Sequence, residues 1–179
     1  QEIYGIHNLP GVPTGELLTR SGIICSSESL FEIKIKGMGG HSSMPQLGRD
    51  TITIGTEVVQ ALQTIISRKI ASGSGAVVSV TEFISNGQRN VLPGETLLKG
   101  DVRTRRPDDR KKIELYLNQI ASGIASAHDI EIEVFFKTEF IETINHIKPT
   151  EAVLKTAKKS GLKITDCKPM SFSEDFAHF

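Results

Sequence analysis

Along residues 31–137 the spacing of the apolar residues switches between the period of two typical of strands and the period near 3.6 typical of helices. The order of these segments restricts the fold more than any other feature of this sequence. Residues 31–36 (FEIKIK) alternate apolar and polar side chains, which is typical of a strand with one wet face. Asp50 is a good helix N-cap residue, and apolar side chains at spacings of three and four follow it, which predicts a helix over 50–69. These side chains are Ile54, Val58, Leu62, Ile65 and Ile66. A run rich in β-branched residues then predicts a strand over 76–83.

The second half of this region repeats the pattern after a polar turn. Residues 95–104 predict a third strand, and Pro107 favours the first position of a helix with an apolar stripe formed by Ile113, Leu117, Ile120 and Ile124. Alternation resumes over 130–136 and predicts a fourth strand. The order β, α, β, β, α, β predicts an α+β fold, a two-layer ferredoxin-like sandwich whose sheet and helices bury one another.

The flanks of this unit predict pieces of a second domain. Residues 1–26 predict a short strand followed by a loop, because Pro and Gly interrupt them repeatedly. Residues 150–160 predict a helix that ends at Gly161, and 162–164 predict a short strand. The chain opens on Gln1 without an initiator Met or signal segment and stops at Phe179, so we expect both ends to continue in a longer protein.

Charge and cysteine content exclude several classes of function. Lys plus Arg equals Asp plus Glu at 21 each, so no basic excess is present to attract nucleic acid. No apolar run is long enough to span a bilayer, and we expect no membrane partner. Cys25 and Cys167 have no framework spacing, which predicts structural thiols in a reducing compartment, the cytoplasm.

Two histidines lie in distinctive segments. His7 in GIHNLP follows a predicted strand, where imidazole can bind a metal, although a histidine that caps a turn is the simpler explanation of an isolated His-Asn. His41 follows glycines in GMGGHSSMP, a stiff loop from which it can donate a hydrogen bond, although a polar connection without function is the alternative. The glycines match neither GxGxxG nor GxxxxGK[ST], so the sequence does not support a nucleotide site.

Two further groupings carry polar side chains of interest. Asn90 begins the segment NVLP, and Arg103 lies 13 residues downstream near the end of a predicted strand. A guanidinium there can hold a substrate carboxylate, and an amide beside it can donate a hydrogen bond. The alternative is that each of the two, taken by itself, is a surface polar residue without function. Glu174 in SEDF either lines a site or belongs to a helix cap.

Taken in this order, the four segments resemble the dinuclear-metal amidohydrolases, a family that includes hippurate hydrolase, N-acyl-amino-acid amidohydrolases, auxin-conjugate hydrolases and carboxypeptidase G. GIHNLP resembles the family's segment with a metal-binding histidine, and GGHSSMP resembles its lid motif GGHxxxP. NVLP, the downstream arginine and SEDF resemble further family segments. The resemblance implies that residues 1–26 and 140–179 belong to a catalytic domain and that 27–139 form a lid that makes a homodimer.

The same resemblance implies a reaction and roles for five residues. A divalent metal pair (Zn, Mn, Ni or Co) activates water to cleave the amide bond of an N-acyl amino acid or a similar small amide. His7 is then a metal ligand, and His41 stabilises the oxyanion across the dimer. Asn90 and Arg103 bind the substrate carboxylate, and Glu174 lines the site.

The sequence also departs from this family at the metal site. The upstream Asp or Cys with His, the paired glutamates and the C-terminal histidine ligand are absent, and His178 does not match the last of these. We therefore predict that this chain by itself is catalytically inactive and holds no stable metal pair. The alternative function is a non-catalytic dimerisation or small-molecule-binding module. An RNA-binding version is disfavoured because the third strand has no aromatic residue.

Overall fold

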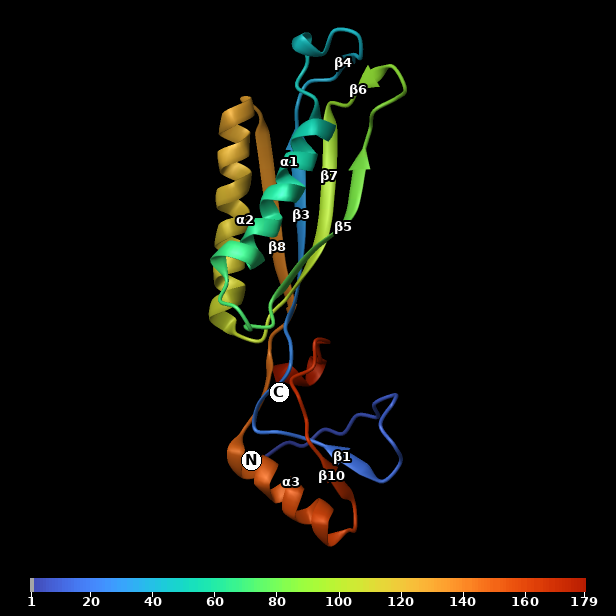
Figure 1. The fold of residues 1–179 in the computed structure, drawn as a ribbon, viewed down its shortest axis with the longest axis vertical. Coiled ribbons are helices and arrows are strands. Elements are labelled where there is room, and N and C mark those ends of the chain that lie inside the picture. Colours follow the sequence, from blue (N-terminus) through green and yellow to red (C-terminus); the bar gives the residue numbers. More distant parts are fainter. Residues whose placement is uncertain (1) are drawn as a thin grey trace.

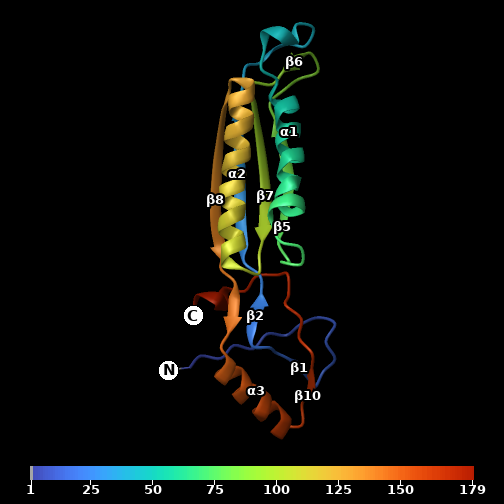
Figure 2. The same cartoon turned by 60° about the vertical axis from the view of Figure 1, so that its left-hand side comes forward.

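A four-stranded antiparallel sheet covered on one face by two helices forms the larger part of the molecule (Figure 1). The structure is a computed structural model that describes residues 2–179. The sheet consists of β3 (Glu28–Lys36), β5 (Val77–Ser85), β7 (Glu95–Arg103) and β8 (Glu131–Phe140) in the order β5-β7-β3-β8. The helices are α1 (Thr51–Thr64) and α2 (Pro107–His128), which lie side by side (Figure 2). The predicted βαββαβ order and the α+β class are confirmed. We call this unit the lid.

The local signals that predicted the two helices act as expected. The Asp50 carboxylate accepts hydrogen bonds from the amide of Ile52 at 3.0 Å and the hydroxyl of Thr53 at 2.6 Å, so it caps α1. A single π-helical turn, η2 (Ile65–Lys69), continues α1 to the predicted end. Pro107 begins α2, and Asp129, whose backbone is left-handed with φ of 53°, is the C-cap residue after its last residue, His128.

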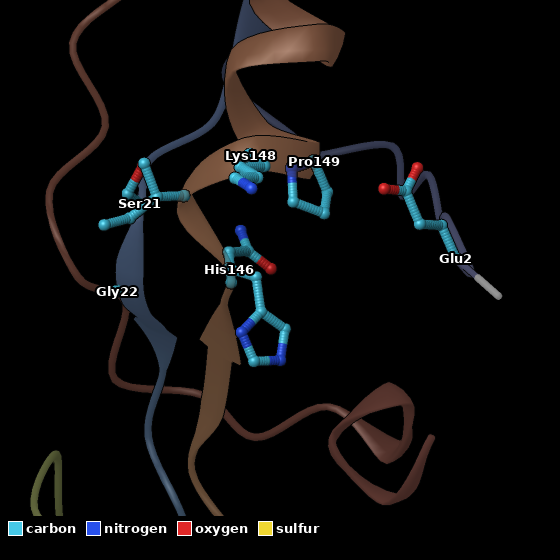
Figure 3. A pocket seen from close by; sticks show the side chains of 8 residues that line it. Glu2, Ser21, Gly22, His146, Lys148 and Pro149 are labelled. Carbon is cyan, nitrogen blue, oxygen red and sulfur yellow. The ribbon is translucent and has the colours of Figure 1, made fainter.

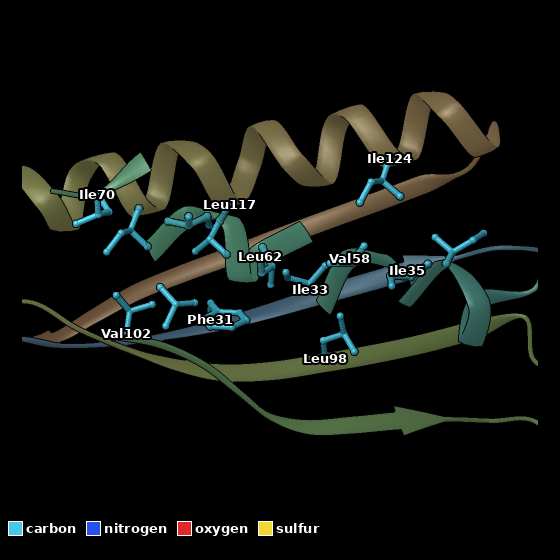
Figure 4. Packing of buried hydrophobic residues seen from close by; sticks show 14 residues of the cluster. Phe31, Ile33, Ile35, Val58, Leu62, Ile70, Leu98, Val102, Leu117 and Ile124 are labelled. Carbon is cyan, nitrogen blue, oxygen red and sulfur yellow. The ribbon is translucent and has the colours of Figure 1, made fainter. Parts of the chain in front are cut away.

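The core of the lid lies between the sheet and the two helices (Figure 4). Phe31, Ile33 and Ile35 of β3 are at most 1% exposed, and each contributes roughly 1.5–3 kcal/mol through burial. Other buried members of this core are Val58, Leu62, Leu98, Val102, Ile113 and Leu117. Gly100 lies directly opposite Phe31 in the sheet, where a Cβ atom would overlap the phenyl ring and the carbonyl oxygen of Ser79. The strand therefore needs glycine at this position.

The other face of the sheet carries no helix and is covered with cross-strand ion pairs. Lys36 contacts Glu133 at 2.7 Å and Glu131 at 3.3 Å, and Lys99 contacts Glu32 at 3.3 Å. These side chains occupy the polar positions of the alternating pattern, so the expected wet face is present.

The two flanks of the lid pair with each other. β1 (Glu16–Leu18) runs parallel to β10 (Lys163–Thr165), β2 (Gly22–Cys25) runs antiparallel to β9 (Thr143–Asn145), and α3 (Ile147–Lys159) follows β9. Figures 1 and 2 show these elements at the end of the molecule that also holds both termini. The predicted strand at the start of the chain is wrong, since residues 2–9 form no regular element. A strand needs a neighbour for its amides and carbonyls, and no strand of the described chain pairs with this segment.

The opposite end of the lid is a small extension, which we call the tip. β4 (Gly40–His41) pairs with β6 (Val91–Leu92), and the short 3-10 helix η1 (Pro45–Leu47) lies between them and α1. The tip projects beyond the helices at the top of Figure 1. No helix within residues 2–179 combines the length and the apolar character that a bilayer crossing requires.

A buried polar network joins the lid to the flanks. The Glu142 carboxylate is 4% exposed and accepts hydrogen bonds from Nε and Nη2 of Arg110 in α2, both at 3.4 Å. The hydroxyl of Thr104 donates to the same carboxylate at 2.7 Å and lies 2.7 Å from the hydroxyl of Ser27. The network thus ties α2 to both connections through which the chain passes between lid and flanks.

Candidate functional site

The five candidate residues fall into two groups at opposite ends of the lid. His41 and Asn90 belong to the tip, whereas His7, Arg103 and Glu174 lie at the end near the flanks, which we call the base. Strand β7 begins beside the tip and ends at Arg103. Its nine residues correspond to a span of roughly 27 Å at about 3.4 Å per residue. Within one chain, the two groups do not form a common site.

His41 is exposed, but its ring is held by its own loop. Nδ1 lies 2.8 Å from the hydroxyl of Ser43 and accepts a hydrogen bond from the backbone amide of Ser43 at 3.2 Å. The carbonyl of His41 accepts from the amide of Met44 at 2.9 Å, which closes a tight turn. Nε2 has no hydrogen-bond partner among residues 2–179, and His41 is exposed, so this nitrogen is available to a group outside the chain.

Asn90 supports the same loop through its backbone. Its carbonyl accepts a hydrogen bond from the amide of Ser42 at 3.0 Å, and the next residue, Val91, pairs with His41. The Asn90 side chain is exposed. Its chain neighbours Arg89 and Val91 line a hollow of about 430 Å³, together with other residues of the tip, the end of β5 and the start of α1. The tip therefore carries His41 and Asn90, both exposed, on two paired segments.

Arg103 is engaged by acidic neighbours at the base. Its Nη2 donates to Glu28 at 2.6 Å, its Nε donates to Asp101 at 2.7 Å, and its Nη1 donates to Ser173 at 3.1 Å. The Ser173 hydroxyl donates in turn to Glu28 at 2.8 Å. These bonds occupy three of the five N–H groups of the guanidinium and leave one on each terminal nitrogen. Arg103 lies at the predicted strand end, but two carboxylates already balance its charge.

His7 and Glu174 approach each other beside this cluster. Nε2 of His7 lies 3.7 Å from Oε2 of Glu174, and Nδ1 lies 2.6 Å from the carbonyl of Asn8. A carbonyl only accepts hydrogen bonds, so Nδ1 carries the proton in the neutral ring and the lone pair lies on Nε2. Such a backbone bond orients many metal-binding histidines. Glu174 precedes the 3-10 helix η3 (Asp175–His178) but makes no side-chain capping bond.

The base does not by itself fit a metal pair. Among residues 2–179, no three or more His, Cys, Asp or Glu side chains gather closely enough to hold an ion. His7 and Glu174 offer two ligands, while one catalytic zinc usually takes three protein ligands. We therefore assign no catalytic step through a metal to these residues.

The flanks contain an open hollow of about 620 Å³ next to the start of α3 (Figure 3). Its lining residues are Glu2, Ser21, Gly22, Asn145, His146, Ile147, Lys148 and Pro149. None of the five candidate residues borders it. The hollow therefore gives no additional support to the predicted site.

The two thiols are not poised for nucleophilic chemistry. Cys25 and Cys167 are buried and unbridged. Burial, followed by the nearby charge of Glu174, raises the pKa of the Cys25 thiol to about 11, and burial also raises the pKa of Cys167. A thiol is a weak nucleophile until it loses its proton, so both cysteines have the character of core residues.

Three residues of these groups were missed in the sequence. Ser43 lies two positions after His41, and short hydroxyl side chains in tight turns often bond to neighbouring groups, which is a usable signal. Asp101 lies two positions before Arg103 and therefore on the same face of the strand. Glu28 comes from another strand, and no local pattern links it to Arg103.

Comparison with known proteins identifies the origin of this arrangement. The family model described as the peptidase dimerisation domain of M20 proteins matches residues 29–129. The chain belongs to the M20 family. The match spans the lid from β3 to the end of α2, and the resemblance drawn from the four segments is confirmed.

Curated M20 relatives extend the match over the flanks. The N-acetyldiaminopimelate deacetylase of Leuconostoc mesenteroides is 33% identical in an alignment of 179 residues that covers 99% of this chain and 47% of that protein. The N-acetylcysteine deacetylase of Bacillus subtilis is 30% identical over 175 residues, 98% of this chain and 46% of that protein. The chain thus spans about half the length of these relatives.

A solved M20 structure has the same arrangement of elements. The YXEP protein of Bacillus subtilis, described as a dinuclear metal binding peptidase, superimposes with a TM-score of 0.77 and 25% identity. The superposition covers 96% of this chain and 42% of that protein. Lid and flanks therefore both follow an M20 structure.

Proposed function

We propose that this chain is the lid, with adjoining strips of the catalytic domain, of a metal-dependent amidohydrolase that cleaves the amide bond of N-acyl amino acids. The observation that carries the proposal is the separation of His41 and Asn90 from His7, Arg103 and Glu174 by the length of β7. Deacetylases of N-acetylated amino acids among the relatives support the substrate class. We assign residues 1–26 and 140–179 to the catalytic domain and 27–139 to the lid. The buried free thiols agree with a cytoplasmic location.

A homodimer would bring the two groups of residues together. Strand β5 runs from the base, where Val77 pairs with Arg103, to the tip, where Ser85 pairs with Thr96. If β5 pairs with its copy across a twofold axis, the strands run antiparallel and the tip of one lid lies beside the base of its partner. His41 of each protomer then completes the site of the other.

The composition of the two sheet edges favours β5 over β8 as the dimer edge. One of the nine residues of β5 is charged, whereas four of the ten residues of β8 are charged. Charged edges resist pairing with another sheet, while apolar edges promote it. Val77, Phe83 and Ile84 of β5 are 40–49% exposed. A partner strand would cover this apolar surface.

In the assembled site, each residue has a distinct task. The Nε2–H group of His41 donates to the scissile carbonyl oxygen as negative charge develops on it. Asn90 and the two remaining N–H groups of Arg103 bind the carboxylate of the substrate. His7 would hold one metal ion through Nε2, the remaining ligands would have to come from residues outside this chain, and the metal pair would supply the chemistry of water activation. The isolated chain is thus proposed to be inactive.

Mixing two inactive variants tests the shared site. We would build a full-length chimera in which these 179 residues replace the matching half of the Leuconostoc deacetylase, and then prepare His41→Ala and His7→Ala forms. Unfolded and refolded together, the variants should regain roughly a quarter of wild-type deacetylation, since half of the dimers are mixed and each mixed dimer holds one complete site. No recovery, with mixed dimers present, would place His41 in the site of its own protomer. An inactive parent chimera that retains its dimer and its metal would count against the amidohydrolase proposal itself.

The inactivity of the isolated chain has its own assay. Hydrolysis of N-acetyldiaminopimelate and of hippurate would be measured with added Mn²⁺ or Zn²⁺. We expect no turnover above the His41→Ala control. Turnover that this substitution abolishes would contradict the proposed incompleteness of the site. Binding of these compounds without turnover would favour the small-molecule-binding alternative.

A further inference from the structure

The strongest unassigned feature of the tip is the pair of contacts between Ser43 and the His41 ring. Both the hydroxyl and the backbone amide of Ser43 approach the same nitrogen, Nδ1, at 2.8 Å and 3.2 Å. The contacts are local, because the turn from His41 to Met44 holds both residues. The ring is therefore held from one side only.

These contacts determine which nitrogen carries the proton. A backbone amide donates a hydrogen bond and cannot accept one, so Nδ1 must present its lone pair to Ser43. The hydroxyl of Ser43, which can rotate, then also donates to Nδ1. In the neutral ring the single proton must lie on Nε2, the nitrogen that has no hydrogen-bond partner among residues 2–179.

The alternative tautomer would have the opposite chemistry. With the proton on Nδ1, the ring would direct one N–H toward the amide of Ser43 and would present a lone pair outward from Nε2. A lone pair repels an oxygen that gains negative charge, whereas an N–H stabilises it. The orientation of the proton therefore decides whether the tip assists acyl transfer.

We infer that Ser43 is a positioning residue that holds His41 in the Nε2–H tautomer. The functional meaning of this inference rests on the proposed role of His41 as an oxyanion donor, but the tautomer is a property of the chain alone. Ser42 provides a matched comparison, because it lies in the same turn and, within residues 2–179, its only hydrogen bond is that of its backbone amide to Asn90.

The test is ¹⁵N NMR of the His41 ring in the 179-residue chain at a pH at which the ring is neutral. We expect a protonated Nε2 and an unprotonated Nδ1 in the wild type. Ser43→Ala should shift the tautomer ratio about fivefold toward Nδ1–H, the effect expected when one net hydrogen bond is lost. Ser43→Thr should restore the wild-type ratio, and Ser42→Ala should leave it unchanged.

Several results would overturn the inference. A wild-type ring with its proton on Nδ1 would contradict it directly, as would a ratio that Ser43→Ala leaves unchanged. An equal shift in Ser42→Ala would show that general loosening of the turn is responsible. Because the measurement needs neither substrate nor a partner domain, its failure is separate from failure of the mixing experiment, which tests the site itself.

Discussion

The buried pair between Arg110 and Glu142 offers the most direct test of how the lid is fastened to the flanks. Glu142→Gln preserves the shape of the side chain and an acceptor for Thr104, but removes the charge that faces Arg110. Removal of one partner from a buried pair costs about 3–5 kcal/mol, because the other charge remains buried and uncompensated. The Arg110 side chain is 18% exposed, so water stabilises its charge in part and reduces this cost. We expect a loss of about 3 kcal/mol in the free energy of unfolding, at the lower end of that range.

Urea unfolding followed by circular dichroism measures this loss. With a slope of about 2 kcal/mol per molar urea, the midpoint should fall by about 1.5 M. Glu32→Gln is the matched control, since Glu32 pairs with Lys99 at 3.3 Å on the wet face, where exposed pairs contribute below about 1 kcal/mol. Replacing both Arg110 and Glu142 with Met should recover most of the lost stability. Equal effects of Glu142→Gln and Glu32→Gln would refute the argument.

Three further predictions follow from contacts described above. Gly100→Ala should lower the free energy of unfolding by about 2–3 kcal/mol, because the added Cβ overlaps Phe31. The loss should be smaller when Gly100→Ala is made in a Phe31→Leu chain, and an equal loss in the wild type and in Phe31→Leu would contradict the overlap. The pKa of Cys25 rises from 9.0 to about 11 in the folded chain, so the unfolded chain releases the thiol proton first and the free energy of unfolding falls as the pH rises between these values. Over this interval, denaturant titrations should show that the wild type loses about 2–3 kcal/mol more than Cys25→Ala. An equal dependence on pH in both proteins would show that the folded thiol ionises normally. Ile84→Lys should yield monomers in light scattering while Phe135→Lys on the opposite edge leaves dimers, and the reverse outcome would assign the interface to β8.

The lid was predictable because its signals are local and agree with one another. The alternation around Ile33 has a period of two, and the stripe through Val58 has a period near 3.6, so each element reveals both its type and its buried face. Six elements in this order bury one another without another domain. The structure confirms both the order and the core side chains.

The flanks could be predicted less well because their strands depend on distant partners. β1 has three residues, and Glu16 pairs with Lys163, 147 positions away. Such a short segment has no informative period, and it becomes a strand only because another strand lies beside it. The expected strand before His7 failed for the converse reason, since no described strand pairs with it.

The sequence predicted which residues are candidates for the site, but it did not predict which side chains surround them. Arg103 was expected as a cation near a strand end, and it lies there. Glu28 balances it from the neighbouring strand, and sequence spacing gives no measure of that contact. Similarly, Asn90 and Arg103 were expected to bind one carboxylate together, but within one chain they lie at opposite ends of β7.

The distance from the base of the lid to its tip depends on the alternation of buried and exposed side chains along its strands. Side chains alternate between the two faces of β7, so inserting one residue would exchange Leu98 with Lys99 and expose the core. Only changes of two residues in both β3 and β7 keep the buried face intact, and each such change moves the tip by about 7 Å. That displacement is far greater than the length of a hydrogen bond, in which donor and acceptor lie within about 3.2 Å of each other. If His41 acts on a partner's site, the same apolar pattern that stabilises the lid therefore also sets the distance at which its imidazole can act.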